Sequence, residues 1–520
     1  MLTKGRPTRP ETSGSGAGET LTGNRGLQWE EALIFEKDSP GSCGVDLPEP
    51  PEVESRLGGL ERREAIGLPS IAEPQVVRHY TRLSQKNYAI DYGLYPLGSC
   101  TMKHNPRLNE KMARLGGFAD IHPLQPESTV QGALELIDTL ARWLKVLTGM
   151  PAVAMSPAAG AHGELCGMMA IRSALEDRGD PRRRVLVPSS AHGTNPATAA
   201  ALGYAVEEIP ERDDGRVDLA ALESKLGPDV AAIMLTNPNT CGLFEYDIVE
   251  IARLVHAVGA FFYCDGANFN ALVGRVRPAD LGIDVMHLNL HKTFSTPHGG
   301  GGPGSGPVVL SEALAPFAPF PWVVHGDGGF RLVEAPEGGG TGAKSFGRLK
   351  GFHGQMGMFV RALAYMMSHG RDGLRQVSGD AVLNANYLLA RLKDTLSVPF
   401  PGPCMHEVLF DDRFLRNTGV TTLDIAKALI DEGFHPMTIY FPLVVHGAML
   451  VEPTETESKT GLDRFADVLK ALAERAKAGD AEFFRQAPRL APRRRLDETR
   501  AARKPVLRWR PADAAAEAAQ

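Results

Sequence analysis

The chain has 520 residues, with a hydrophobic fraction of 43%, a charged fraction of 23% and a net charge of −6. This length allows at least two domains with a sizeable core, and the composition excludes a disordered or fibrous protein. Because there is no basic excess, neither nucleic acid nor an anionic membrane surface is expected as a partner.

Cysteine usage and the chain start point to a cytoplasmic protein. The six cysteines form no CxxC pair, which argues against a disulfide framework or a zinc ribbon and favours a reducing compartment. The first twenty residues lack the apolar stretch of a signal peptide. No apolar run is long enough to span a membrane, so we expect no membrane partner.

Composition and periodicity divide the chain into four predicted segments. Residues 1–60 are expected to form an N-terminal arm, and residues 491–520 a C-terminal tail, because neither has the apolar periodicity of a core. Between them, residues 61–395 are expected to form a large domain and residues 396–490 a smaller one.

Helix and strand patterns alternate through the large domain. Apolar residues at helical spacing predict a helix over 128–147, with Ser128 and Gln131 as its capping box. A second helix is expected to open at Gly160 and to end near residue 177. Strands are predicted next at 185–187, 205–209, 230–235, 260–264 and 285–290, with helices at 196–202, 218–226 and 247–258 between them. Such alternation is typical of βαβ units and predicts an α/β fold with a doubly wound, mostly parallel sheet.

The pattern after residue 400 predicts a smaller α/β domain. Strands are expected at 405–410 and 448–451, and a helix at 422–432. A further helix shows a buried stripe that contains Leu462, Phe465, Leu469 and Leu472.

Polar segments follow several of the predicted strands, at 189–195, 236–240, 265–268 and 291–293. Ligands of open α/β sheets bind in the crevice beyond the carboxyl ends of the strands. Lys292 lies there, where partial desolvation would favour an uncharged amine that can attack an aldehyde. A lone lysine before a glycine-rich turn is ordinarily a solvated surface residue. The neighbouring motifs favour the functional interpretation here.

Three neighbours complete a pattern that suits pyridoxal phosphate (PLP). Asp265 ends the preceding strand and can hold a proton on a pyridine nitrogen, although a turn cap is an equally simple role. Gly160 and Ala161 open a helix whose N-terminal amides can bind a phosphate. His192 can stack on a planar ring, and the alternative interpretation is an ordinary loop histidine. His287 and His291 are spaced i,i+4 but sit in a predicted strand, so no metal site is expected.

Four long motifs carry a family resemblance: YPLGSCTMKHNP at 95–106, SAHGTNP at 190–196, CDGAN at 264–268, and HLNLHKTF at 287–294 with PHGGGGP at 297–303. They resemble the P-protein of the glycine cleavage system, the decarboxylating glycine dehydrogenase, and in particular subunit 2 of its two-subunit bacterial form. The likeness runs from about residue 60 to about residue 490. The arm and the tail fall outside it.

The resemblance implies an aspartate-aminotransferase-type (fold type I) PLP enzyme that decarboxylates glycine. It implies that Lys292 carries PLP as a Schiff base, that Asp265 pairs with the pyridine nitrogen, and that His192 stacks on the ring opposite Ala267. It places further cofactor contacts at Gly160, Ala161, Thr194, Asn237 and His291. It implies a homologous subunit 1, as an α2β2 assembly, and the lipoylated H-protein as partners. The loop with Thr341, Gly342 and Lys344 is expected near the cofactor or a subunit interface.

Two alternatives remain open at this point. Another fold type I enzyme would fit, either an aminotransferase or a cysteine desulfurase, and Cys404 is the candidate nucleophile for the latter. A catalytically silent structural subunit is a different class of protein, and the presence of both Lys292 and Asp265 argues against it.

Overall fold

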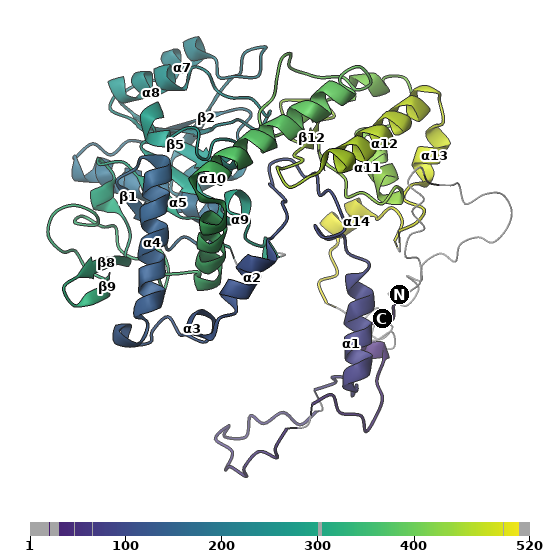
Figure 1. Cartoon of the computed structure of the whole chain (residues 1–520), viewed down its shortest axis with the longest axis horizontal. Helices are drawn as coiled ribbons and strands as arrows, with labels where there is room; N and C mark the ends of the chain where they lie inside the picture. Colours follow the sequence, from purple (N-terminus) through teal and green to yellow (C-terminus); the bar gives the residue numbers. More distant parts are fainter. Residues whose placement is uncertain are drawn as a thin grey trace. The chain divides into compact units, whose positions relative to one another are not determined.

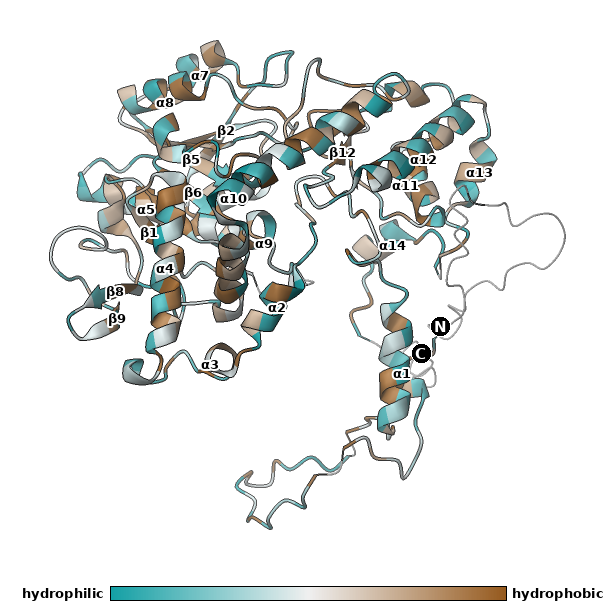
Figure 2. Cartoon of the chain, in the orientation of Figure 1, coloured by the Kyte–Doolittle hydropathy of each residue, from teal (hydrophilic) through white to brown (hydrophobic). Residues whose placement is uncertain are grey.

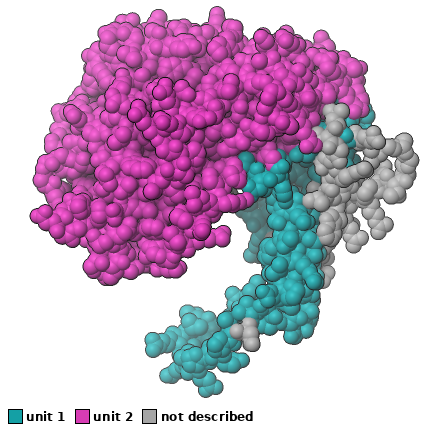
Figure 3. All heavy atoms as spheres, in the orientation of Figure 1, with its two compact units in different colours: residues 1–92, 427–433, 482–520 teal, residues 93–426, 434–481 magenta. Residues whose placement is uncertain are grey.

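The computed structural model describes residues 20, 31–45, 47–64, 66–299, 304–491 and 493–508. Much of the predicted arm and the end of the predicted tail lie outside these described residues. Contacts divide the chain into two compact units, coloured separately in Figure 3. The first comprises Met1–Tyr92, Lys427–Gly433 and Glu482–Gln520, and the second comprises Gly93–Ala426 and Phe434–Ala481. The predicted domain boundary near residue 395 stays a prediction.

A seven-stranded sheet forms the centre of the second unit, in the order β1-β7-β6-β5-β4-β2-β3. Its strands are β1 (Ala152–Ala154), β2 (Arg184–Pro188), β3 (Ala205–Ile209), β4 (Val230–Thr236), β5 (Phe261–Gly266), β6 (Val285–Leu288) and β7 (Val308–Leu310). The strands from β2 to β6 pair in parallel, and β7 is antiparallel to both β6 and β1. The predicted mostly parallel sheet is therefore confirmed.

Helices cover both faces of this sheet (Figure 1). Ile233 and Phe262 point to one face, where they join a core with residues of α4 (Gln131–Thr148), α8 (Ile248–Ala257) and α10 (Met356–Leu392). Their neighbours Met234 and Tyr263 point to the other face, towards α5 (Gly160–Asp177) and α6 (Thr194–Ala201). The ribbon of α4 alternates between brown and teal in Figure 2, and its apolar residues belong to this core.

Two local predictions in this region are wrong. Helix α4 begins at Gln131, and Glu127–Thr129 forms a separate 3-10 turn. The Gln131 amide cannot complete a capping box, because it donates to the Phe330 carbonyl at 2.7 Å and accepts from the Phe330 amide at 2.8 Å. The strand β6 ends at Leu288, and the chain turns at once into the single helical turn α9 (Leu290–Thr293).

A second, three-stranded antiparallel sheet has the order β10-β12-β11. Its strands are β10 (Val408–Phe410), β11 (Thr438–Ile439) and β12 (Met449–Val451). Leu409 and Leu450 pack there in a small core with Cys241 and Leu243. Helix α12 (Lys459–Lys477) carries the predicted buried stripe on one face. The smaller α/β pattern predicted after residue 400 is thus present.

The remaining elements are mostly short. They are α1 (Glu73–Ser84), α2 (Arg107–Ala113), α3 (Gly116–Ala119), α7 (Leu219–Lys225), the hairpin β8 (Trp322–Gly326) and β9 (Gly329–Val333), α11 (Thr422–Asp431), α13 (Ala481–Gln486) and α14 (Glu498–Arg503). In the first unit, Glu31 accepts from Arg82 and His79 of α1, and the bond from Arg82, followed by those from Lys37 and His79, holds the pKa of Glu31 well below its usual range. Over the described part of the chain, every helix is too short or too polar to cross a bilayer.

Candidate active site

The predicted site residues come together where the parallel strands end. Asp265 is the penultimate residue of β5, and Lys292 lies in α9, shortly after β6. His192 lies in the loop that connects β2 to α6. The Asn195 side chain, three residues after His192, donates to Asp265 at 2.9 Å, and β5 pairs in parallel with β6, which leads into Lys292. The three residues therefore lie at one edge of the sheet, where open α/β sheets have their ligand crevice.

Asp265 is a buried carboxylate held from several sides. One oxygen accepts the Ala267 amide at 2.9 Å, and the other accepts the Asn195 side-chain amide at 2.9 Å. The His287 Nε2 lies 3.3 Å from the carboxylate, and its Nδ1 lies 2.6 Å from the Tyr263 hydroxyl. These contacts fix the orientation of the carboxylate.

The Lys292 amine donates to the Ser99 carbonyl at 2.7 Å. Ser99 belongs to the 95–106 motif, which runs alongside α9. Lys103 of the same motif donates to the Thr293 carbonyl at 2.9 Å and pairs with Glu455 at 2.7 Å. The motif therefore supports the lysine-bearing turn, a role that the sequence alone does not assign.

His192 is open to solvent on one side of the crevice. Its Nδ1 lies 2.8 Å from the Thr194 hydroxyl, and its ring meets Phe441 edge-on at 5.6 Å. Partial desolvation lowers the pKa of His192, the charge of Asp265 opposes this shift, and Lys292 adds to it. A neutral imidazole with one open face can cover a planar ring, so the geometry is compatible with the predicted stacking.

Glu164 of α5 is a site residue that the sequence did not reveal. It is buried and accepts from the Thr194 hydroxyl at 2.7 Å and from the Thr198 hydroxyl at 2.9 Å. Burial, and then the charge of Asp265, raise the pKa of Glu164 to about 7. The only available signal was its place in the first turns of α5, four residues after Gly160.

The start of α5 has the features of a phosphate site. Ala159 at its N-cap carries no side-chain oxygen, so the first-turn amides remain open to an anion. A Cβ on Gly160 would lie 2.8 Å from the Asn289 side chain, so only glycine allows this close approach. His291 lies 3.2 Å from Asn289 through Nε2, and its buried Nδ1 has no partner among the described residues. These groups fit the phosphate of PLP.

The other predicted residues are placed less directly. Asn237 is buried, and its side-chain oxygen accepts the Glu245 backbone amide at 3.0 Å, so it shapes the loop after β4. Ala267 is half-buried and contributes its amide to Asp265. Lys344 pairs with Asp177 at 2.6 Å, at the opposite end of α5 from Gly160. That position is away from the crevice, and the predicted role of this loop at a subunit interface stays a prediction.

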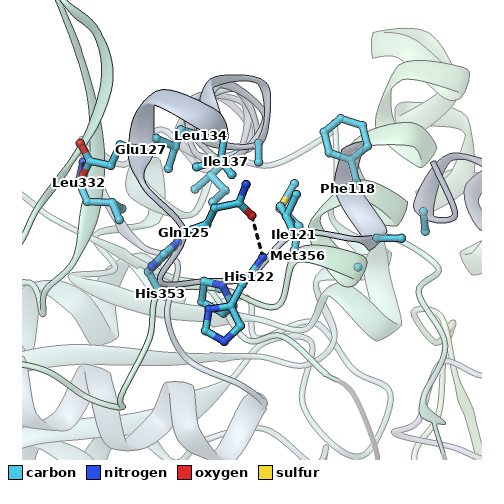
Figure 4. Close-up of a pocket in the computed structure, with 17 residues that line it drawn as sticks. Phe118, Ile121, His122, Gln125, Glu127, Leu134, Ile137, Leu332, His353 and Met356 are labelled. Carbon is cyan, nitrogen blue, oxygen red and sulfur yellow. Dashed lines mark hydrogen bonds between the residues drawn. The ribbon is translucent and has the colours of Figure 1, made fainter. Parts of the chain in front are cut away.

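Histidine pairing does not create a metal site in this crevice, because His287 faces Tyr263 and Asp265 whereas His291 faces Asn289. Within the described residues, one set of possible metal ligands converges, namely His406, Glu407 and Glu452. A separate cavity of about 300 Å³ lies between α3, α4 and the start of α10, where Leu134, Ile137 and Met356 line it (Figure 4). It contains none of the predicted cofactor residues.

Comparisons with known proteins agree with this arrangement. Residues 377–489 match the family model described as glycine dehydrogenase, C-terminal domain, and residues 163–302 match the aminotransferase class-V model. Two solved structures share the fold. Glycine decarboxylase (P-protein) of the glycine cleavage system, in inhibitor-bound form, has a TM-score of 0.65 at 23% identity, over 85% of this chain and 93% of that one. A NifS-like protein has a TM-score of 0.56 at 13% identity, over 72% of this chain and 98% of that one. At these identities they establish the fold alone, which is the fold type I of PLP enzymes.

Curated relatives are far more similar in sequence. A protein of Caulobacter vibrioides named probable glycine dehydrogenase (decarboxylating) subunit 2 is 71% identical over 526 aligned positions, covering 100% of both chains. One of the same name from Kosmotoga olearia is 51% identical over 92% of this chain and 99% of that protein. These alignments cover the motifs and the fold around them. The chain therefore belongs to the family of glycine dehydrogenase (decarboxylating) subunit 2.

Proposed function

We propose that the chain is the PLP-bearing subunit of a glycine dehydrogenase that decarboxylates glycine and passes the aminomethyl group to a lipoyl arm. One observation supports this proposal: Lys292, Asp265 and His192, to which the family resemblance gives roles, lie where β6, β5 and β2 end, at one edge of the parallel sheet. The amides at the start of α5 open a site for the phosphate beside them.

Each group has a defined task in this proposal. When bound, PLP supplies an electron sink for the pair released as the bond between the glycine Cα and its carboxyl carbon breaks. Lys292 supplies the amine that holds the cofactor. Asp265 would hold a proton on the pyridine nitrogen, and His192 and Ala267 would hold the ring from its two faces. Transfer of the aminomethyl group would form a bond from its carbon to one lipoyl sulfur as the S–S bond breaks, and the second sulfur would leave as a thiolate that takes up a proton.

A cysteine desulfurase is the weaker candidate. That reaction needs an accessible thiolate, whereas Cys404 is buried and its thiol pKa is raised to about 12 by burial. The Cys404 amide is also held by the Asn386 side chain at 3.1 Å, so the residue does not lie on a free loop. An aminotransferase would use the same crevice and is separated from the main proposal by assay.

The proposal includes partners and a compartment. A homologous subunit 1 would complete the enzyme as an α2β2 assembly, and the lipoylated H-protein would receive the aminomethyl group from glycine. The family name of the relatives, subunit 2, supports the first partner. A cytoplasmic location agrees with six cysteines that are all free thiols in the structure.

The test is exchange of labelled CO2 into the carboxyl group of glycine. The chain, a homologous subunit 1, PLP and lipoylated H-protein are assayed together, beside Lys292→Ala and the control Lys111→Ala, which changes an exposed lysine of α2. We expect exchange with wild type and the control, and none with Lys292→Ala. Binding of PLP without any exchange, together with amino transfer to a keto acid, would instead establish the aminotransferase.

A further inference from the structure

The turn that holds the Lys292 amine has an unusual backbone. Ser99 and Thr101 have φ angles of 61° and 49°, in the left-handed region that non-glycine residues rarely adopt. Between them the Ser99 carbonyl points at Lys292 and accepts its amine at 2.7 Å. Such conformations persist where the surrounding structure fixes them. The groups that fix this turn therefore decide where the carbonyl points.

Two carboxylates from the small sheet hold this turn. Glu407, directly before β10, accepts the Ser99 amide at 2.7 Å. Glu452, directly after β12, accepts the Thr101 amide at 2.8 Å and the Thr101 hydroxyl at 2.6 Å. Both side chains have 0% exposure. A hydrogen bond in a dry environment is stronger than one at the surface.

The same two residues form a closed polar cluster with His406. One oxygen of Glu407 and both ring nitrogens of His406 have no hydrogen-bond partner among the described residues, although His406 Nε2 lies 3.7 Å from a Glu452 oxygen, and all three residues are fully buried. Burial, and then the charge of Glu452, raise the pKa of Glu407, and burial likewise raises the pKa of Glu452. The charge of Lys292 opposes both shifts. Lys292 is thus coupled to the pair by charge as well as through the Ser99 carbonyl.

We propose that Glu407 and Glu452 are positioning residues for Lys292, which fix the 99–101 turn so that the Ser99 carbonyl holds the lysine amine in the crevice. Neither carboxylate touches Lys292, and each acts through the turn. A lysine side chain has many rotamers, and a single fixed acceptor selects among them. The use made of this amine rests on the proposed function, but the positioning itself does not.

The chain offers a closely matched control for Glu407. Glu245 is also buried, accepts one backbone amide, that of Val217, at 2.9 Å, and has its other oxygen without a partner among the described residues. The Glu245 carboxylate holds a different turn, which makes no contact with Lys292 among the described hydrogen bonds. Glu407→Ala and Glu245→Ala therefore remove equivalent groups and leave equivalent cavities.

The first measurement is hydrogen exchange of the full chain without cofactor, read on a peptide that covers residues 95–106. We expect Glu407→Ala to speed exchange of the protected amide by at least about tenfold, as when a buried amide loses its acceptor. Glu245→Ala should leave this peptide unchanged. Glu407→Gln keeps an acceptor for the Ser99 amide and should restore protection. If it exchanges as fast as Glu407→Ala, acceptance by this side chain does not fix the turn, and the proposal fails.

The second measurement is the reactivity of the lysines in the same cofactor-free chain. Reductive methylation with limiting formaldehyde, followed by peptide mass mapping, compares Lys292 with the exposed Lys111. Release of the turn should change the labelling of Lys292 relative to Lys111 by several-fold in Glu407→Ala and leave it unchanged in Glu245→Ala. Equal labelling of Lys292 in wild type and Glu407→Ala would overturn the proposal. If Glu407→Ala does not fold, Glu407→Asp, which withdraws the carboxylate by one methylene, is tested in the same way.

These measurements separate the positioning from the proposed function, because neither needs PLP. A chain that never binds PLP but shows both effects keeps the positioning role and loses the proposed function. A chain that binds PLP through Lys292, but whose turn and lysine ignore the loss of Glu407, keeps the function and loses the positioning role.

Discussion

Replacing Asp265 by asparagine should separate the charge of this group from its shape. The asparagine oxygen can still accept the Ala267 amide, which Asp265 accepts at 2.9 Å. Its new NH2 group would face the Asn195 amide, which now donates at 2.9 Å. Asn195 can turn over, because its own carbonyl oxygen is buried without a partner among the described residues. The variant should therefore fold and bind PLP nearly as wild type does.

The expected loss is in the rate. Asp265 is only 3% exposed, so its charge acts on the pyridine nitrogen with little screening by water. Losing a key electrostatic stabiliser of this kind lowers a rate by about 10²-fold or more, or about 3 kcal/mol. Glu164 is another buried acidic side chain of this region, but its carboxyl is committed to the Thr194 and Thr198 hydroxyls. We expect no rescue from it.

The assay is CO2 exchange into glycine with subunit 1 and H-protein present, beside the visible spectrum and the thermal unfolding midpoint. Asn195→Ala is the control, because it removes a neighbour of the carboxylate but keeps the charge. It should lose much less activity than Asp265→Asn. A near-wild-type rate in Asp265→Asn would refute the reasoning and show that another group protonates the ring.

Three further predictions concern single side chains. Borohydride reduction after addition of PLP should fix the cofactor to Lys292 by peptide mapping, and a label on Lys103 would contradict the site. The pKa of Glu164 rises from 4.5 to about 7 on folding, so the folded state favours its protonated form, and its contribution to stability falls as pH rises through this window. Glu164→Gln should therefore raise the free energy of unfolding of the cofactor-free chain at pH 8 by up to about 3 kcal/mol, and should hardly change it at pH 4. Thermal unfolding at the two pH values measures this difference. Cys404→Ala should retain glycine exchange, whereas loss of activity in a folded variant would revive the desulfurase.

The strands that could be predicted are those with enough buried apolar residues to form a pattern. In β4 all seven residues are buried, and its apolar run is evident in the sequence. The strands β1 and β7 have three residues each, too few for any periodicity to emerge. The 37-residue α10 escaped prediction, and Gly370 interrupts it with non-helical backbone angles, φ 61° and ψ −172°.

Some residues of the site could likewise be predicted from local sequence patterns, and others could not. Lys292 and Asp265 follow recognisable strands, and the edge at which parallel strands end is fixed by topology. The Ser99 amide and Glu407 are 308 positions apart, and Thr101 and Glu452 are 351 apart. No local pattern connects residues at such separations, so these contacts depend on how the small sheet packs against the motif. Glu164 was hidden because its role depends on Thr194, which lies on another helix.

The last prediction is that the chain alone is inactive or nearly so. In its first unit, the segment from residue 47 to 68 exposes large apolar side chains, including Val53 at 81% and Leu60 at 85%. The apolar cavity beside α4 adds a second unfilled surface (Figure 4). Surfaces of this kind mark association sites. We expect subunit 1 to cover them and to close the crevice to water, which would otherwise quench the carbanion before it meets the lipoyl disulfide.

Adding subunit 1 should raise both aminomethyl transfer and apparent mass, and Leu60→Asp should weaken that association more than the exposed polar change Arg62→Ala. Full turnover by this chain as a homodimer would contradict the prediction and return an aminotransferase-like enzyme to consideration.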